Sequence, residues 1–112
     1  LSVQETEENT GEKVMEPTTA ARLRAYMEST ARFGTARIGA PQNCVSGIKT
    51  GTAQTGVYDE NGEEIENYWY AGYICTAQEE PLYTLVVLEE TAGETHVPQA
   101  FRKIGEALVN FN

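Results

Sequence analysis

Apolar residues recur at helical spacing in two segments of the chain. In the first, between Pro17 and Gly34, the stripe consists of Ala20, Leu23, Met27 and Ala31. In the second, after Pro98, it consists of Phe101, Ile104, Leu108 and Phe111. Proline suits a first helical position and glycine a helix end. The pattern therefore predicts amphipathic helices over 17–33 and 98–110, and we expect the second to lie across a sheet.

Three segments between these helices have the composition of strands. Small residues and threonines fill 45–55, aromatic and small residues fill 66–76, and an almost continuous apolar run fills 82–90. Asn61-Gly62 predicts a hairpin turn, and Glu79-Glu80-Pro81 predicts the next turn. Because a nearly continuous apolar strand is usually covered on both faces, we expect 82–90 to be central in its native sheet.

These elements predict an α+β fold, with an antiparallel sheet of about three strands (45–55, 66–76, 82–90) flanked by helices 17–33 and 98–110. Residues 1–16 are acidic and polar, and we expect them to form a loop or a ragged N-terminal segment. We expect residues 17–112 to form a single domain. The resemblance described below implies that this domain is incomplete. Because Leu1 rather than methionine opens the chain, we expect a processed product or an excised piece of a longer protein.

The charge balance excludes several classes of partner. Seventeen acidic and eight basic residues give a net charge of −9, which disfavours nucleic acid and anionic membrane surfaces. The longest apolar run, 83–88, is far shorter than the roughly 20 residues of a spanning helix, and no signal peptide opens the chain. We expect no direct membrane contact by this segment. For Cys44 and Cys75, two free packed thiols are favoured over a cross-strand disulfide.

One stretch of the chain carries a recognisable chemistry. In residues 45–56, Val-Ser-Gly-Ile-Lys-Thr-Gly-Thr-Ala-Gln-Thr-Gly, small residues and threonines surround the single cation Lys49. A strand of this composition allows its backbone to approach a bound carbonyl or carboxylate. Lys49-Thr50-Gly51 resembles the Lys-Thr-Gly box of penicillin-binding proteins and serine β-lactamases.

The resemblance extends beyond this box. Most of residues 14–110 is similar to the C-terminal part of a class B penicillin-binding protein transpeptidase domain. It covers Phe33-Gly34-Thr35-Ala36, Tyr70-Ala71-Gly72-Tyr73, 85–88 and Val97-Pro98-Gln99-Ala100-Phe101. The resemblance implies a partial penicillin-binding transpeptidase fold, in which residues 17–112 are the C-terminal portion of a transpeptidase domain. It also implies an enzyme that acylates its serine with the D-Ala-D-Ala end of a peptidoglycan stem peptide, passes the acyl group to an amine and is trapped by β-lactams.

The resemblance also assigns roles to residues. Lys49 would supply positive charge to the site, and the Thr52 backbone N–H would be one of two oxyanion donors. Thr50, Gly51, Thr52 and Gln54 would contact substrate, with the Thr50 and Thr52 hydroxyls on the same carboxylate that Lys49 helps to hold. No cofactor and no metal is implied.

The family's other two boxes decide what this chain does alone. Ser46-Gly47-Ile48-Lys49 matches Ser-x-x-Lys by letter, but it contains glycine and shares its lysine with the other box. No Ser-x-Asn occurs. We therefore expect a catalytically incomplete C-terminal fragment of a membrane-anchored transpeptidase at the extracytoplasmic face of a bacterial membrane. Since the missing upstream strands would leave an edge of 82–90 unpaired, we also expect a homodimer through the sheet edge.

Two other interpretations of the function remain open. A self-standing α+β binding module that docks through its exposed strand ranks second, and an acyl hydrolase using Ser46 ranks third. Three possible ion or phosphate sites are disfavoured. A metal site at Glu89, Glu90, Glu94 and His96 lacks a fixed spacing. A calcium loop around Gly62 and a phosphate loop at 47–50 both fail at required positions.

Overall fold

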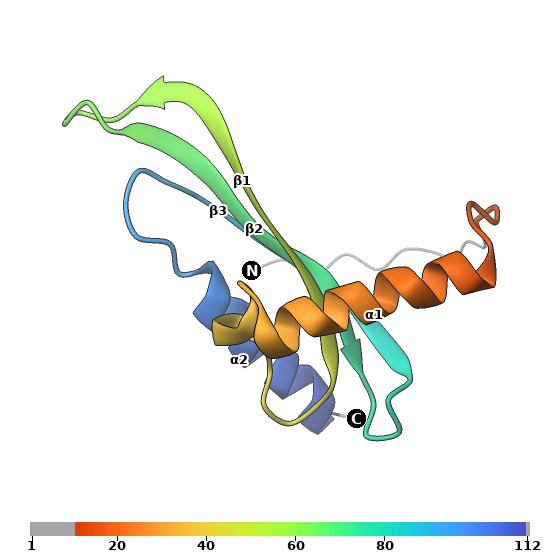
Figure 1. Ribbon diagram of the computed structural model, residues 1–112. Helices are drawn as coiled ribbons and strands as arrows, with labels where there is room; N and C mark the ends of the chain where they lie inside the picture. The colour runs from red at the N-terminus through yellow and green to blue at the C-terminus, as the bar shows by residue number, and fades with distance from the viewer. Residues whose placement is uncertain (1–10, 112) are drawn as a thin grey trace.

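The computed structural model describes residues 11–111, and its elements confirm the predicted α+β class. In chain order they are α1 (Pro17–Phe33), the 3₁₀ turn η1 (Arg37–Gly39), β1 (Ser46–Tyr58), β2 (Glu64–Cys75), β3 (Pro81–Thr91) and α2 (Val97–Phe111). Two helices flank a three-stranded antiparallel sheet (Figure 1). Residues 1–10 of the expected N-terminal segment lie outside the described residues.

The β1–β2 hairpin forms where Asn61-Gly62 predicts it, but both strands run further than expected. Gly62 adopts a φ of +81°, which an L side chain rarely allows, and the Asp59 carboxylate accepts the Asn61 and Glu63 N–H groups at 2.9 Å. A shift of register between Gln54 and Val57 accommodates Gly56 at a φ of +75°. The hairpin therefore projects beyond the helices (Figure 1).

Strand order is β1-β2-β3, so β2 is central among the described residues and β3 lies at an edge. Exposure alternates along β3, and Val86 and Leu88 are 61% and 56% exposed. The expectation that 82–90 is central refers to a larger sheet and stays a prediction, as does the homodimer. β1 is the other edge strand of this sheet.

One face of the sheet carries the core and packs against α2. We call it the core face; Ile48, Tyr70 and Ile74 lie on it and are buried. The buried Phe101 ring of α2 lies 5.6 Å from the Tyr70 ring, between centroids. A Cβ on Gly105 would come closer than 3.0 Å to Pro41, so glycine allows this close approach of α2. The predicted packing of the second helix across the sheet is confirmed.

The opposite face of β1 carries Gly47, Lys49 and Gly51, and we call it the lysine face. α1 contacts this face where the Tyr73 hydroxyl lies 2.9 Å from a Glu28 carboxylate oxygen and 3.1 Å from the Arg24 carbonyl oxygen. Burial raises the pKa of Tyr73 to about 12, and the Glu28 hydrogen bond acts in the same direction. Tyr73 therefore joins α1 to the central strand.

The apolar stripe predicted for α1 is only partly buried. Ala31 is 5% exposed and joins the core, whereas Leu23 remains 47% exposed. The helix itself has the predicted bounds, and the Gly34 N–H bonds the Thr30 carbonyl at its end. The N-terminal part of α1 extends past the sheet and its C-terminal part crosses the sheet (Figure 1), so only the C-terminal end reaches the core.

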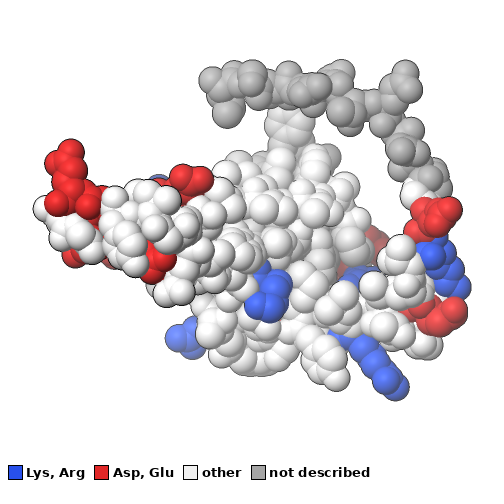
Figure 2. All heavy atoms as spheres, turned by 90° about the horizontal axis from the view of Figure 1, so that it is seen from above, with Lys and Arg blue, Asp and Glu red and all other residues white. Residues whose placement is uncertain are grey.

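Acidic side chains gather at one end of the molecule. The β1–β2 turn carries Asp59, Glu60 and Glu63, and a cluster of acids is visible at the end where this hairpin projects (Figure 2). The opposite end shows acidic and basic side chains together, and the visible face between the ends is mostly uncharged (Figure 2). The tip of this hairpin is therefore acidic.

Candidate functional site

The candidate site is the open edge of β1. Because Cys75 N–H bonds the Val45 carbonyl at 2.9 Å and the register continues unbroken to Gln54, odd-numbered residues of β1 pair with β2. Even-numbered residues, which include Thr50 and Thr52, direct their N–H and C=O groups away from the sheet. The Thr52 N–H thus points to the side where a ligand can pair with the strand.

Lys49 reaches this edge from the lysine face. Its side chain is exposed, and the ammonium Nζ donates to the Thr50 carbonyl oxygen at 2.6 Å. That carbonyl belongs to the outward row of backbone groups. A cation and the Thr52 N–H donor therefore lie along the same short stretch of open edge, where they can act on an anionic or carbonyl oxygen.

The threonine side chains lie on the other face. Thr50 and Thr52 belong to the core face, where a small cavity of about 70 Å³ is lined by parts of β1, β2 and the start of α2: Thr50, Gly51, Thr52, Tyr68, Trp69, Tyr70, Thr95, Val97 and Pro98. Gln54 is exposed further along the strand. The structure thus places Lys49 and the two threonine side chains on opposite faces, and only the backbone edge is common to both.

Ser46 is poorly placed to act as a nucleophile. It is 6% exposed, and it sits at the start of a strand rather than a helix. On a strand, residues three apart point to opposite faces, so Lys49 does not share a face with Ser46. This geometry argues against the acyl hydrolase interpretation.

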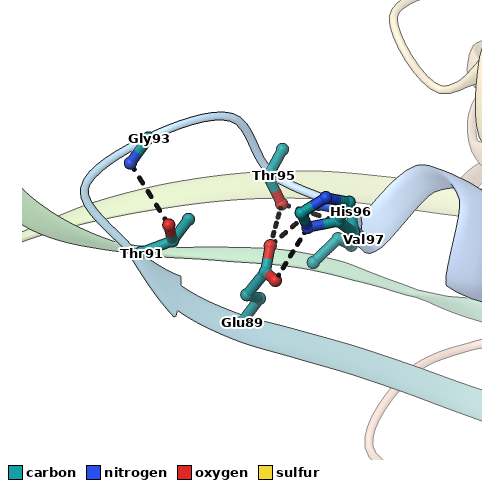
Figure 3. Close-up of polar contacts among 6 residues, drawn as sticks. All are labelled: Glu89, Thr91, Gly93, Thr95, His96 and Val97. Atoms are coloured by element: carbon teal, nitrogen blue, oxygen red, sulfur yellow. Dashed lines mark hydrogen bonds and ion pairs between the residues drawn. The ribbon is translucent and has the colours of Figure 1, made fainter.

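A carboxylate holds the loop beside the small cavity. Glu89 Oε1 accepts the His96 N–H at 2.8 Å and the Thr95 hydroxyl at 2.9 Å, while Oε2 lies 3.2 Å from His96 Nδ1 (Figure 3). The His96 backbone bond, followed by the Thr95 bond, lowers the pKa of the Glu89 carboxyl. The Glu89–loop contact fixes Thr95, which lines the cavity.

The pattern of residues alone missed this contact. The sequence signal nearest to it is a threonine, Thr95, shortly before Pro98, which is typical of a helix start. The Thr95 hydroxyl indeed accepts the Val97 N–H at 3.2 Å at the start of α2. The pairing of Glu89 with this loop depends on where β3 ends relative to α2. Among residues 11–111, no group of three or more His, Cys, Asp or Glu side chains is arranged to hold a metal.

A larger hollow lies elsewhere. It measures about 490 Å³ between the C-terminal half of α1 and the segment before β1, and its lining includes Glu28, Arg32, Cys44 and Ser46 but none of residues 49–54. Cys44 and Cys75 are free thiols, as expected, and burial raises the pKa of both. This hollow is larger than the cavity beside Thr50 and Thr52. The cation and the backbone donor of the candidate site nevertheless lie at the open edge of β1, away from the larger hollow.

The fold defines an α+β domain with two helices on a three-stranded sheet. Residues 2–106 match the family model described as penicillin binding protein transpeptidase domain, and the chain therefore belongs to this family. No curated protein matches the chain. In the described part of the chain, no helix is long and apolar enough to cross a membrane.

Proposed function

We propose that this chain supplies the Lys-Thr-Gly wall of the active site in a serine D,D-transpeptidase of the class B type. The supporting observation is that Lys49 Nζ and the outward Thr52 N–H lie on one open strand edge, in a chain that belongs to the transpeptidase family. In this proposal Thr52 N–H is an oxyanion donor, and Lys49 supplies positive charge to the hydrogen-bond network that holds the substrate carboxylate.

The substrate-binding part of the proposal includes Thr50, Gly51 and Gln54. Gly51 keeps the strand flat, and Thr50 and Thr52 offer backbone groups at the edge and hydroxyls toward the small cavity. Because the threonine side chains face away from Lys49, backbone pairing is the main contact with an extended stem peptide or a β-lactam. Losing one oxyanion donor typically costs about 2.7–4 kcal/mol in the transition state.

The serine nucleophile and the Ser-x-Asn box belong, in this proposal, to residues outside these 112. The intact enzyme is anchored at the extracytoplasmic face of a bacterial membrane and cross-links peptidoglycan. The chain by itself is inactive, since a nucleophile on a helix and the second oxyanion donor are both needed for acylation.

The experiment compares the chain with the intact transpeptidase that contains it. Both are incubated with a fluorescent penicillin, denatured and weighed by mass spectrometry. We expect one adduct per intact protein, on a serine outside residues 1–112, and none on the chain alone. An adduct on Ser2, Ser29 or Ser46, or an intact protein that acquires no adduct, contradicts the proposal.

A further inference from the structure

Two aromatic rings of β2 lie on the lysine face directly beside Lys49. The register pairs Gly47 with Tyr73, Lys49 with Ala71 and Gly51 with Trp69. These six residues all belong to the lysine face, because positions two apart share a face of a sheet. Lys49 therefore stands opposite a small residue, and each of its neighbours on this face of β1 is a glycine that stands opposite an aromatic residue.

The glycines leave the space that the rings occupy. A Cβ on Gly47 would come closer than 3.0 Å to the Tyr73 ring, and a Cβ on Gly51 would come closer than 3.0 Å to the Trp69 indole. Both rings thus extend from β2 across β1, one on each side of Lys49. We call Trp69 and Tyr73 the aromatic bracket.

The aromatic bracket limits where the Lys49 side chain can go. Along the strand, it meets the Tyr73 ring on one side and the Trp69 ring on the other. Across the sheet it meets Ala71 and then Val86, which offer no acceptor for an ammonium group. Among the directions that lie along the sheet surface, the open edge is the one that remains, and there Nζ bonds the Thr50 carbonyl at 2.6 Å.

Tyr73 is itself held in place. Its hydroxyl lies within hydrogen-bond distance of Glu28 and of the Arg24 carbonyl, and the Arg24 guanidinium carbon lies 5.7 Å from its ring centroid. Trp69 is half-buried and has Leu88 of β3 as its partner on the other side. The bracket is therefore held by elements outside β1. A substitution of either ring alters the space beside Lys49 and leaves the amino-acid sequence of β1 unchanged.

We propose that Trp69 and Tyr73 are positioning residues, which hold the Lys49 ammonium at the open edge of β1. This inference rests on the proposed function for the role of Lys49, but its geometric part concerns the chain alone. It identifies a structural reason for glycine at both Gly47 and Gly51: each glycine admits one ring of the bracket.

The first test measures the order of the Lys49 side chain in the 112-residue chain. Lysine-selective ¹³C labelling gives few signals, because the chain has only Lys13, Lys49 and Lys103. We expect Trp69→Met to lower the order parameter at Lys49 Cε, since methionine keeps apolar bulk but replaces a rigid plane by a flexible chain. Trp69→Phe should retain most of the order, and Lys13 and Lys103 should not respond.

Leu88→Met is the matched control, because Leu88 lies on the same face one strand further from Lys49. The backbone amide spectrum verifies that each variant is folded. Unchanged order at Lys49 in a folded Trp69→Met protein overturns the proposal, and so does an equal loss in Leu88→Met. Should Trp69→Met not fold, Trp69→Phe and Tyr73→Met decide: loss of Lys49 order in Tyr73→Met with retention in Trp69→Phe supports the bracket, and the reverse overturns it.

The second test uses the intact transpeptidase. Trp69→Met should slow acylation by penicillin about tenfold to hundredfold, since a misplacement of about 1 Å costs up to roughly 10² in rate. Trp69→Phe should restore most of this rate, and Leu88→Met should leave it unchanged. An intact wild-type protein that is not acylated contradicts the proposed function, whereas the order of Lys49 still decides the bracket.

Discussion

The two faces of the sheet are filled in different ways. On the core face, Ile48 and Ile74 are fully buried under the Phe101 ring and its neighbours. On the lysine face, α1 covers the region of Tyr73, while Val86 and Leu88 remain 61% and 56% exposed. Packing on the core face holds the sheet together, and the lysine face keeps a cation at an accessible edge. The same strand serves both because side chains alternate.

The largest difference between the faces should appear in stability. Phe101→Ala removes a fully buried ring, and we expect a loss of about 3–5 kcal/mol in the free energy of unfolding. Leu88→Ala on the lysine face should lose under about 1 kcal/mol, because this residue is already exposed. Urea unfolding of both variants measures the difference. Equal losses would show that the lysine face is a second core.

Activity should show the opposite pattern. In the intact transpeptidase, Lys49→Ala should slow acylation by about 10²–10³-fold, as expected for loss of a charge aimed at the reacting group. Its melting temperature should barely change, because the side chain is exposed. Lys103→Ala, an exposed lysine of α2, is the control. A large fall in melting temperature with normal acylation would assign Lys49 to the fold instead.

The contact of α1 with the lysine face should depend on alkaline pH. Tyr73 has its pKa raised to about 12, against an ordinary value of 10.0, so its neutral form is favoured in the folded protein. This contribution is complete below pH 10 and is lost as the pH rises from about 10 to 12. Tyr73→Phe should remove this part of the pH dependence. Stability is measured by urea unfolding from pH 8 to 11, and identical slopes for both proteins would exclude the Tyr73 contact as its cause.

The smallest expected effect concerns Glu89, at the edge of the core face. Its pKa is lowered from 4.5, so the charged form stabilises the loop above about pH 4.5, and this stabilisation declines as the pH falls through the lower folded value. Glu89→Gln should speed hydrogen exchange at the His96 amide at neutral pH and make it less sensitive to acid. Thr91→Val removes the neighbouring Thr91–Gly93 contact and serves as a control (Figure 3). Unaltered exchange at His96 in Glu89→Gln would mean that the turn holds itself.

Local signals in the sequence determined much of this molecule. Pro17 set the start of α1 because its ring fixes φ, and Gly34 marked its end. Asn61-Gly62 set the hairpin because glycine readily adopts the φ of +81° that the turn requires. The Lys-Thr-Gly string pointed to one strand as the candidate site, and its threonines and lysine were identified together. The resemblance placed the lysine and the threonine hydroxyls at one carboxylate, whereas the strand puts these side chains on opposite faces, and the cavity beneath the threonines required α2.

Only the tertiary structure decided which neighbours those residues have. The apolar run of β3 favours a central strand, yet strand order leaves it at an edge of the described sheet. The stripe of α1 predicts burial along its length, yet the crossing over the sheet buries Ala31 and exposes Leu23. The pairing of Gly51 with Trp69, and of Glu89 with His96, depends on register and on loop closure. These are long-range relations between segments, and no local preference encodes them.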